Sequence, residues 1–241
     1  MTDLYLIRHG QAMLAIEEAL IDTGLSPLGV RQTERLRDRL AATGEIAADV
    51  LIASTMPRAK QTAEILAPAL GLPIIFDDEV QEWREGKVED LEQTNVEEYN
   101  SRFRAAPFDQ KPFFRTVPSS ETWVEFMLRA ASALNRITHE HEGKTIVIVC
   151  HGGIVDCSII SFFGMSSLQF PKAYFRTHNT SITHWYRDTP PEDFPPGWVL
   201  ERYNDTMHLR DINSPVRIPW KDIATRPAVS AEGSKAPTEA E

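Results

Sequence analysis

The sequence has only two cysteines, no long apolar run and no basic tract, and each absence argues against a class of protein. Cys150 and Cys157 both lie in apolar stretches, so we expect small buried side chains in a reducing compartment, not a disulfide or a metal pair. No stretch approaches the roughly 20 apolar residues of a membrane span, so no membrane partner is expected. A formal net charge of -10 without any nucleic-acid motif argues against a nucleic-acid partner.

Length and composition indicate one globular domain. Of the 241 residues, 42% are hydrophobic and 25% are charged, which is enough for one substantial core. Arg8 comes so early that no signal peptide is expected, and a cytoplasmic protein is predicted. No surface stripe stands apart from the core patterns, so a monomer and a homodimer are equally acceptable.

Four short apolar runs are typical of strands. They cover residues 4–7, 50–53, 73–76 and 146–150. Because they are almost continuously apolar, we expect central strands that helices cover on both faces.

Helical patterns lie between these runs. In the first, Ser26 is a candidate cap, Pro27 occupies the first turn and Gly44 ends the helix; the second runs over 57–71. A third pattern covers 119–143 and is expected to begin at its pair of serines, with Glu121 in the first turn. Its apolar stripe, predicted to be core, consists of Trp123, Phe126, Met127, Ala130, Leu134 and Ile137.

The alternation of strands and helices predicts an α/β fold with a mostly parallel sheet between helices. Ligands of such sheets bind beyond the carboxyl ends of the strands. The domain is predicted over residues 1–212, with 85–118 as an insertion that forms a lid. Residues 181–188 and 198–205 predict an antiparallel hairpin at the sheet edge. The composition of 213–241 predicts a tail whose last part is disordered.

Basic side chains follow two of the apolar runs, in LYLIRHGQA and TIVIVCHGG. If the carboxyl ends of these runs are neighbours, Arg8, His9 and His151 meet in one pocket, and Arg58 joins them from the first turn of the next helix. Paired guanidinium donors match the oxygens of a phosphoryl group. This clustering of like charge therefore predicts a site for a small phosphorylated substrate.

Two histidines and a carboxylate add chemistry to this anion site. An imidazole can attack phosphorus and form a covalent phosphoenzyme, while a second imidazole stabilises the charge on the phosphoryl oxygens. Glu82, after the third run, is placed to act as general acid toward the leaving group and then as general base toward water. Burial favours its protonated form and the nearby arginines oppose it.

Six segments in order resemble the histidine phosphatase superfamily: LIRHGQA, SPLGVRQTERL, ASTMPRAKQTAEIL, the glutamate of VQEWREG, VCHGG and NTSI. The match extends over most of residues 4–209. The resemblance implies a three-layer α/β/α sandwich with a helical insertion over the site, and neither a metal nor a cofactor. It also implies roles for single residues: His9 as the phosphorylated nucleophile, Arg8 and Arg58 as phosphate ligands, His151 completing the pocket, Glu82 as acid and base, and the Gly152 amide as a phosphate contact.

Within the superfamily the sequence favours a phosphatase. Phosphoglycerate mutases have the pattern RHGES-x-WN after the first strand, whereas this chain has RHGQAMLA. In this stretch Gln11 is a candidate phosphate contact. The asparagine that helps mutases hold the phosphate is missing, because Ala15 stands at its position. The segment after Glu82 also differs from the NERxYG pattern of mutases. Net hydrolysis of a phosphomonoester is therefore predicted.

Two alternatives to hydrolysis stay open at this point. The chain can be a phosphoglycerate or sugar-phosphate mutase, or a weakly active module that recognises a phosphorylated partner. A pure binding module has no need of Glu82, which argues against the second. A zinc site of His9, His151 and one of three later histidines lacks any ligand spacing; these are His178, His184 and His208. The identity of the substrate is not readable from the insertion.

Overall fold

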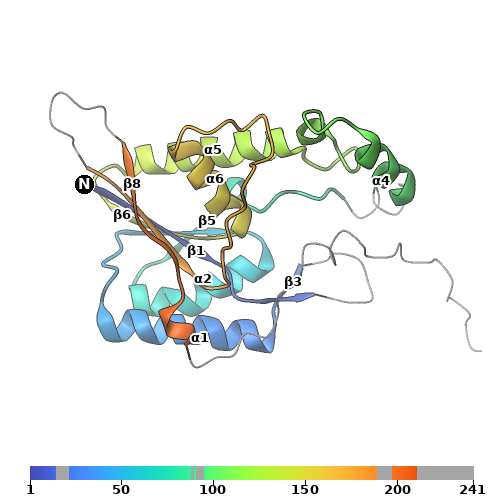
Figure 1. The fold of residues 1–241 in the computed structure, drawn as a ribbon. Coiled ribbons are helices and arrows are strands. Elements are labelled where there is room, and N and C mark those ends of the chain that lie inside the picture. Colours follow the sequence, from blue (N-terminus) through green and yellow to red (C-terminus); the bar gives the residue numbers. More distant parts are fainter. Residues whose placement is uncertain (15–21, 88–89, 91–94, 189–196, 211–241) are drawn as a thin grey trace, which may run out of the picture.

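A computed structural model describes residues 1–14, 22–87, 90, 95–188 and 197–210. A six-stranded sheet with the order β5-β4-β6-β1-β7-β8 forms its centre, and helices cover both faces (Figure 1). The strands are β1 (Thr2–Arg8), β4 (Val50–Ser54), β5 (Ile74–Asp77), β6 (Thr145–Cys150), β7 (Ile182–Arg187) and β8 (Trp198–Asp205). β5, β4, β6 and β1 are mutually parallel, and β7 is antiparallel to both of its neighbours, β1 and β8. The predicted α/β fold with a mostly parallel sheet is confirmed.

The pairing of β1 with β6 positions the predicted site. The strands are parallel and in register, with Ile7 opposite Val149 and Arg8 opposite Cys150. Their carboxyl ends therefore lie side by side, as the two sequence motifs require. The residues that follow each strand start from adjacent points on one edge of the sheet.

Helices α1 (Pro27–Thr43) and α2 (Pro57–Leu70) cover one face of the sheet. The Ser26 hydroxyl accepts a hydrogen bond from the Gly29 amide at 3.0 Å. Gly44 ends the helix in a left-handed conformation with a φ of 59°, which costs glycine little. Both predicted helix ends are confirmed.

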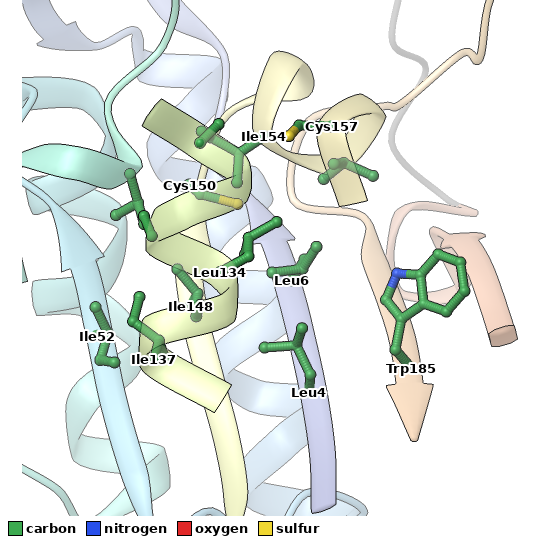
Figure 2. Packing of buried hydrophobic residues seen from close by; sticks show 14 of the residues in the cluster. Leu4, Leu6, Ile52, Leu134, Ile137, Ile148, Cys150, Ile154, Cys157 and Trp185 are labelled. Carbon is green, nitrogen blue, oxygen red and sulfur yellow. The ribbon is translucent and has the colours of Figure 1, made fainter. Parts of the chain in front are cut away.

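Helices α5 (Trp123–Glu140) and α6 (Gly152–Phe162) cover the other face. Figure 2 shows Leu6 of β1 and Ile148 of β6 on the side of the sheet that α5 covers, beside Leu134. Cys150 and Cys157 are buried free thiols, which confirms their predicted role as small core side chains.

Two expectations about these elements are wrong. α5 does not begin at the serine pair: Thr122 caps it through a reciprocal capping box with Glu125, and Glu121 lies outside the helix, where it pairs with Arg129. The run 73–76 is not a central strand. β5 has a single neighbour, β4, and Ile75 and Phe76 are 50% and 43% exposed.

The remaining described elements are short. They are β2 (Ala12–Leu14) paired with β3 (Asp22–Leu25), the 3-10 turns η1 (Asp78–Val80), η2 (Lys111–Phe113) and η3 (Met207–Leu209), and α4 (Val96–Ala105). α4 and η2 belong to the predicted insertion, whose aromatic rings meet one another and Phe170; its action as a lid stays a prediction.

The predicted antiparallel hairpin is confirmed by the β7–β8 pairing. Its turn, the tail 213–241 and the position of Ala15 lie outside the described residues. Among the helices that the structure describes, none is both long and apolar enough to span a membrane.

Candidate active site

The predicted basic residues meet at the carboxyl edge of the sheet. Arg8 is the last residue of β1 and His9 follows it. His151 follows β6 and caps the N-terminus of α6. Arg58 is the second residue of α2, which begins shortly after β4. Parallel strands thus bring together residues that lie up to 143 positions apart, from Arg8 to His151 (151 − 8).

His9 is buried, with 5% of its surface exposed. Its Nδ1 lies 2.6 Å from the Gly10 carbonyl oxygen, and Arg58 Nε lies 3.1 Å from its Nε2. A carbonyl can only accept and a guanidinium can only donate, so Nδ1 carries the proton and Nε2 carries the lone pair. Burial, together with the charges of Arg8 and Arg58, lowers the pKa of His9 well below its ordinary value. His9 is therefore a neutral imidazole with a lone pair in the pocket.

His151 faces His9, with ring centroids 5.1 Å apart, and is fully buried. Its Nε2 lies 2.8 Å from the Ser54 hydroxyl, and its Nδ1 is buried without a hydrogen-bond partner among the described residues. Burial lowers the pKa of His151, and the neighbouring His9 and Arg58 lower it further. An anion between the two rings would offset the charge repulsion that adds to burial in opposing the protonation of this imidazole.

The two arginines are held in different ways. Arg58 Nη1 pairs with Asp22 of β3 at 2.9 Å, which leaves Nε directed at His9. Arg8 Nη1 donates to the Thr177 carbonyl, while its Nε is buried without a partner in the described part of the chain. Burial lowers the pKa of Arg8, although Glu82 opposes this shift. Arg8 and His151 thus both present unpartnered nitrogens.

Glu82 reaches the same site from the segment after η1. Its Oε2 accepts a hydrogen bond from the Gly153 amide at 3.1 Å, and its Oε1 accepts one from the Trp83 amide at 3.1 Å. A Cβ on Gly153 would stand only 2.1 Å from Glu82 Oε1, so any side chain there would displace this carboxylate. Gly152 lies next to Arg8, since a Cβ on it would be 3.8 Å from Arg8 Nε. The carboxylate is thereby anchored at the N-terminus of α6.

Gln11 has a structural partner in this structure. Its Oε1 accepts a hydrogen bond from the Ser26 hydroxyl at 2.8 Å, and its backbone amide donates to Gln32 at 2.9 Å. These contacts fasten the start of β2 to the start of α1. A contact of Gln11 with phosphate stays a prediction.

Several residues of this region were not predicted. Asp22 holds Arg58, and the Asn179 amide donates to the His9 carbonyl at 3.0 Å. Two site residues could have been predicted from the sequence: Ser54, because it is the first polar residue after an apolar run, and Asn179, because it lies in the NTSI segment. Asp22 stands in no motif. Asp156, one turn into α6, has a buried Oδ1 with no partner in the described structure, and burial and then Glu82 raise its pKa to about 7.

The later histidines have other partners. His178 Nδ1 lies 2.8 Å from Asn204 Nδ2, His184 pairs with Asp3 at 2.7 Å, and His208 Nε2 lies 2.9 Å from the Thr180 hydroxyl. Within the described residues no group of three His, Cys, Asp or Glu side chains is arranged to hold a metal ion.

The chain belongs to the histidine phosphatase superfamily (branch 1), whose family model matches residues 4–206. The predicted resemblance is confirmed over most of the chain.

Individual relatives carry different names. A probable phosphoglycerate mutase GpmB of Proteus mirabilis (strain HI4320) is 29% identical over 216 residues, which cover 88% of this chain and 97% of that protein. The solved structure of Bacillus stearothermophilus YhfR is 26% identical with a TM-score of 0.65 and covers 87% of this chain and 100% of its own. Phosphoserine phosphatase from Entamoeba histolytica in complex with phosphoserine is 23% identical with a TM-score of 0.64 and the same coverage, and shows the common fold.

Proposed function

We propose that the protein hydrolyses a small phosphomonoester through a phosphohistidine on His9. The observation that carries this proposal is the neutral His9 imidazole, which presents its Nε2 lone pair between Arg58 and His151. An imidazole held unprotonated among cations is a nucleophile ready for an electrophile that carries negative charge.

In the first step His9 Nε2 attacks phosphorus, and the bond from phosphorus to the ester oxygen breaks. The entering phosphoryl group displaces the 3.1 Å contact between His9 and Arg58 and receives the Arg58 donor itself. Arg8 Nε and His151 Nδ1, both without partners, supply further donors to the equatorial oxygens, His151 after taking up a proton. The Gly152 amide at the start of α6 adds a neutral donor.

Glu82 serves both halves of the reaction. In its protonated form it gives its proton to the departing ester oxygen, which leaves as an alcohol. The resulting carboxylate then takes a proton from water, whose oxygen attacks the phosphorus on His9. Orthophosphate is released and His9 is regenerated.

Phosphate transfer back to an organic acceptor is the second candidate. It is favoured by the name of the Proteus mirabilis relative, whereas the Entamoeba histolytica protein supports hydrolysis by its name. Hydrolysis is preferred because the mutase asparagine has no counterpart in RHGQAMLA.

The test combines a substrate panel with an acid-quench trap. Purified protein is incubated with phosphoserine, 3-phosphoglycerate, glycerol 3-phosphate and 4-nitrophenyl phosphate, and phosphate release and labelled His9 are measured. We expect release of free phosphate, a label that is lost in His9→Ala, and at least about a hundredfold loss of turnover in that variant. Undiminished turnover without any label would refute the covalent mechanism. Isomerised 3-phosphoglycerate forming faster than free phosphate, with 2,3-bisphosphoglycerate added, would instead identify a mutase.

A further inference from the structure

Arg129 of α5 makes an unusually complete set of contacts beside Glu82. Its Nε and Nη2 donate to the Glu121 carboxylate at 2.6 and 2.7 Å. Its Nη1 donates to the carbonyls of Glu79 and Gln81 at 2.6 and 3.0 Å, and its Nη2 also donates to the Glu82 carbonyl at 3.1 Å. A guanidinium has five N–H donors, so each of them is used. Three of the five hold the backbone that leads into Glu82.

Glu121 holds the backbone that leaves Glu82. Its carboxylate accepts a hydrogen bond from the Arg84 amide at 3.0 Å, and its own amide donates to the Arg84 carbonyl at 2.9 Å. Its carbonyl accepts the indole N–H of Trp83 at 2.8 Å. One ion pair therefore fixes the chain on both sides of the glutamate.

The pair is buried and electrically balanced. The side chains of Arg129 and Glu121 are 7% and 14% exposed, and the guanidinium lies over the Phe126 ring at 5.4 Å. Buried ion pairs often add little net stability over apolar packing, because desolvation offsets their attraction. What this pair does supply is geometry, since a planar fork fixes several carbonyls at once.

We propose that the Arg129–Glu121 ion pair is a positioning pair that sets the Glu82 carboxylate against the ester oxygen and, later, against the attacking water. This inference rests on the proposed function, because it concerns proton transfer by Glu82. In this role neither Arg129 nor Glu121 contacts the substrate. Both act through the backbone of residues 79–84. A carboxylate displaced by about 1 Å can lose about a hundredfold in rate.

Three variants test the pair. Arg129→Lys keeps the positive charge but loses the planar guanidinium and its set of donors. Glu121→Gln keeps the shape of the side chain but loses the negative charge. Arg39→Lys is the matched control, because Arg39 of α1 also pairs with two carboxylates, Glu45 and Asp205, at 16% exposure and outside the site. Thermal unfolding of each variant is recorded, and single-turnover phosphorylation of His9 is measured with 4-nitrophenyl phosphate and with propyl phosphate.

The leaving group separates positioning from general damage. Nitrophenolate departs without a proton, whereas an alkoxide needs one from Glu82. In Arg129→Lys and Glu121→Gln we expect phosphorylation by propyl phosphate to slow at least about tenfold more than phosphorylation by 4-nitrophenyl phosphate, and phosphohistidine to accumulate because its hydrolysis also needs Glu82. Arg39→Lys should leave the ratio of the two rates unchanged.

A double mutant completes the test. With Glu82→Gln as background, Arg129→Lys should cause no further loss with propyl phosphate, since a positioning residue has nothing left to position. Equal slowing of both esters, or additive losses in the double mutant, would overturn the inference while phosphohistidine formation in the wild type still supported the proposed function. Absence of phosphohistidine in the wild type would overturn the proposed function itself. If Arg129→Lys does not fold, the same comparisons with the isosteric Glu121→Gln decide.

Discussion

At the scale of single residues, Asp156 is a carboxyl group in a costly environment. Its Oδ1 is buried without a partner in the described structure, and its pKa is raised from 3.8 to about 7 by burial and then by Glu82, although Arg8 opposes the shift. A group whose folded pKa lies above its unfolded pKa binds more protons in the folded chain. Its contribution to the free energy of unfolding therefore falls as the pH rises from 3.8 to about 7.

Asp156→Asn should stabilise the protein above that pH range, because the amide removes the cost of a buried charge. The gain is at most about 4 kcal/mol, since one pKa unit corresponds to about 1.4 kcal/mol. Urea unfolding at pH 5 and pH 8 measures it, and the variant should gain more at pH 8 than at pH 5. A gain of the same size at both pH values would contradict the assigned ionisation.

At the scale of elements, the start of α6 is in direct contact with the segment after η1. The Gly153 amide binds the Glu82 carboxylate, and the absence of a side chain at Gly153 leaves room for that carboxylate. The start of α6 thus positions two groups of the site: Glu82 through the Gly153 amide, and His151 as the N-cap residue of the helix. A substitution in the first turn of α6 should therefore impair proton transfer by Glu82 more than it impairs folding.

Gly153→Ala should displace Glu82, because the new Cβ would stand 2.1 Å from its Oε1 and 2.8 Å from the Phe126 ring. We expect turnover of alkyl phosphates to fall about a hundredfold, while circular dichroism shows an intact fold. Gly197→Ala is the control, since a Cβ there meets no atom of the described residues within 4 Å. Wild-type turnover in Gly153→Ala would show that the contact with Gly153 does not position Glu82.

At the scale of the whole molecule, a chain with a net charge of -10 binds an anion only through a local field. In the free protein the pKa values of His9 and His151 lie well below 6.5, because the rings are buried beside two arginines. A bound dianion raises the pKa of His151, whose Nδ1 has no partner in the described structure, so a complex in which this ring takes up a proton holds more protons than its free components. Affinity for a dianion should therefore increase as the pH falls toward 6.

Sulfate tests this coupling, because it stays a dianion over the whole range and any proton taken up belongs to the protein. Calorimetric titration at pH 6 in two buffers of different ionisation enthalpy should show net proton uptake and tighter binding than at pH 8. His151→Asn should reduce the uptake, and Arg58→Met should weaken binding at both pH values. Sulfate binding that is independent of pH and buffer would contradict the proton uptake by His151 on anion binding.

Local signals account for the elements that were predicted correctly. Ser26, Pro27 and Gly44 delimit α1 through contacts within a few residues, so their effect does not depend on the rest of the fold. The apolar runs likewise marked β1, β4 and β6. The start of α5 was mispredicted because Ser120 and Thr122 are both good caps, and the choice depends on Glu125 closing a capping box.

Contacts distant in sequence account for what was missed. β5 lies at an edge because of the strand order, which an apolar run does not encode. Asp22 meets Arg58 across 36 positions, and Arg129 meets the segment before Glu82 across about 50, without any motif that joins them. The pairing of such residues is decided by packing.

By itself the sequence determined which chemical groups this protein can present: a histidine and an arginine at the end of one strand, a histidine at the end of another, and a carboxylate after a third. The tertiary structure decided which nitrogen of His9 carries the lone pair, how Glu82 is held and which charges are neutralised. The physical reason is range. Strand and helix signals act over a few residues, whereas ionisation and orientation depend on burial and on partners that only folding brings within a few ångströms.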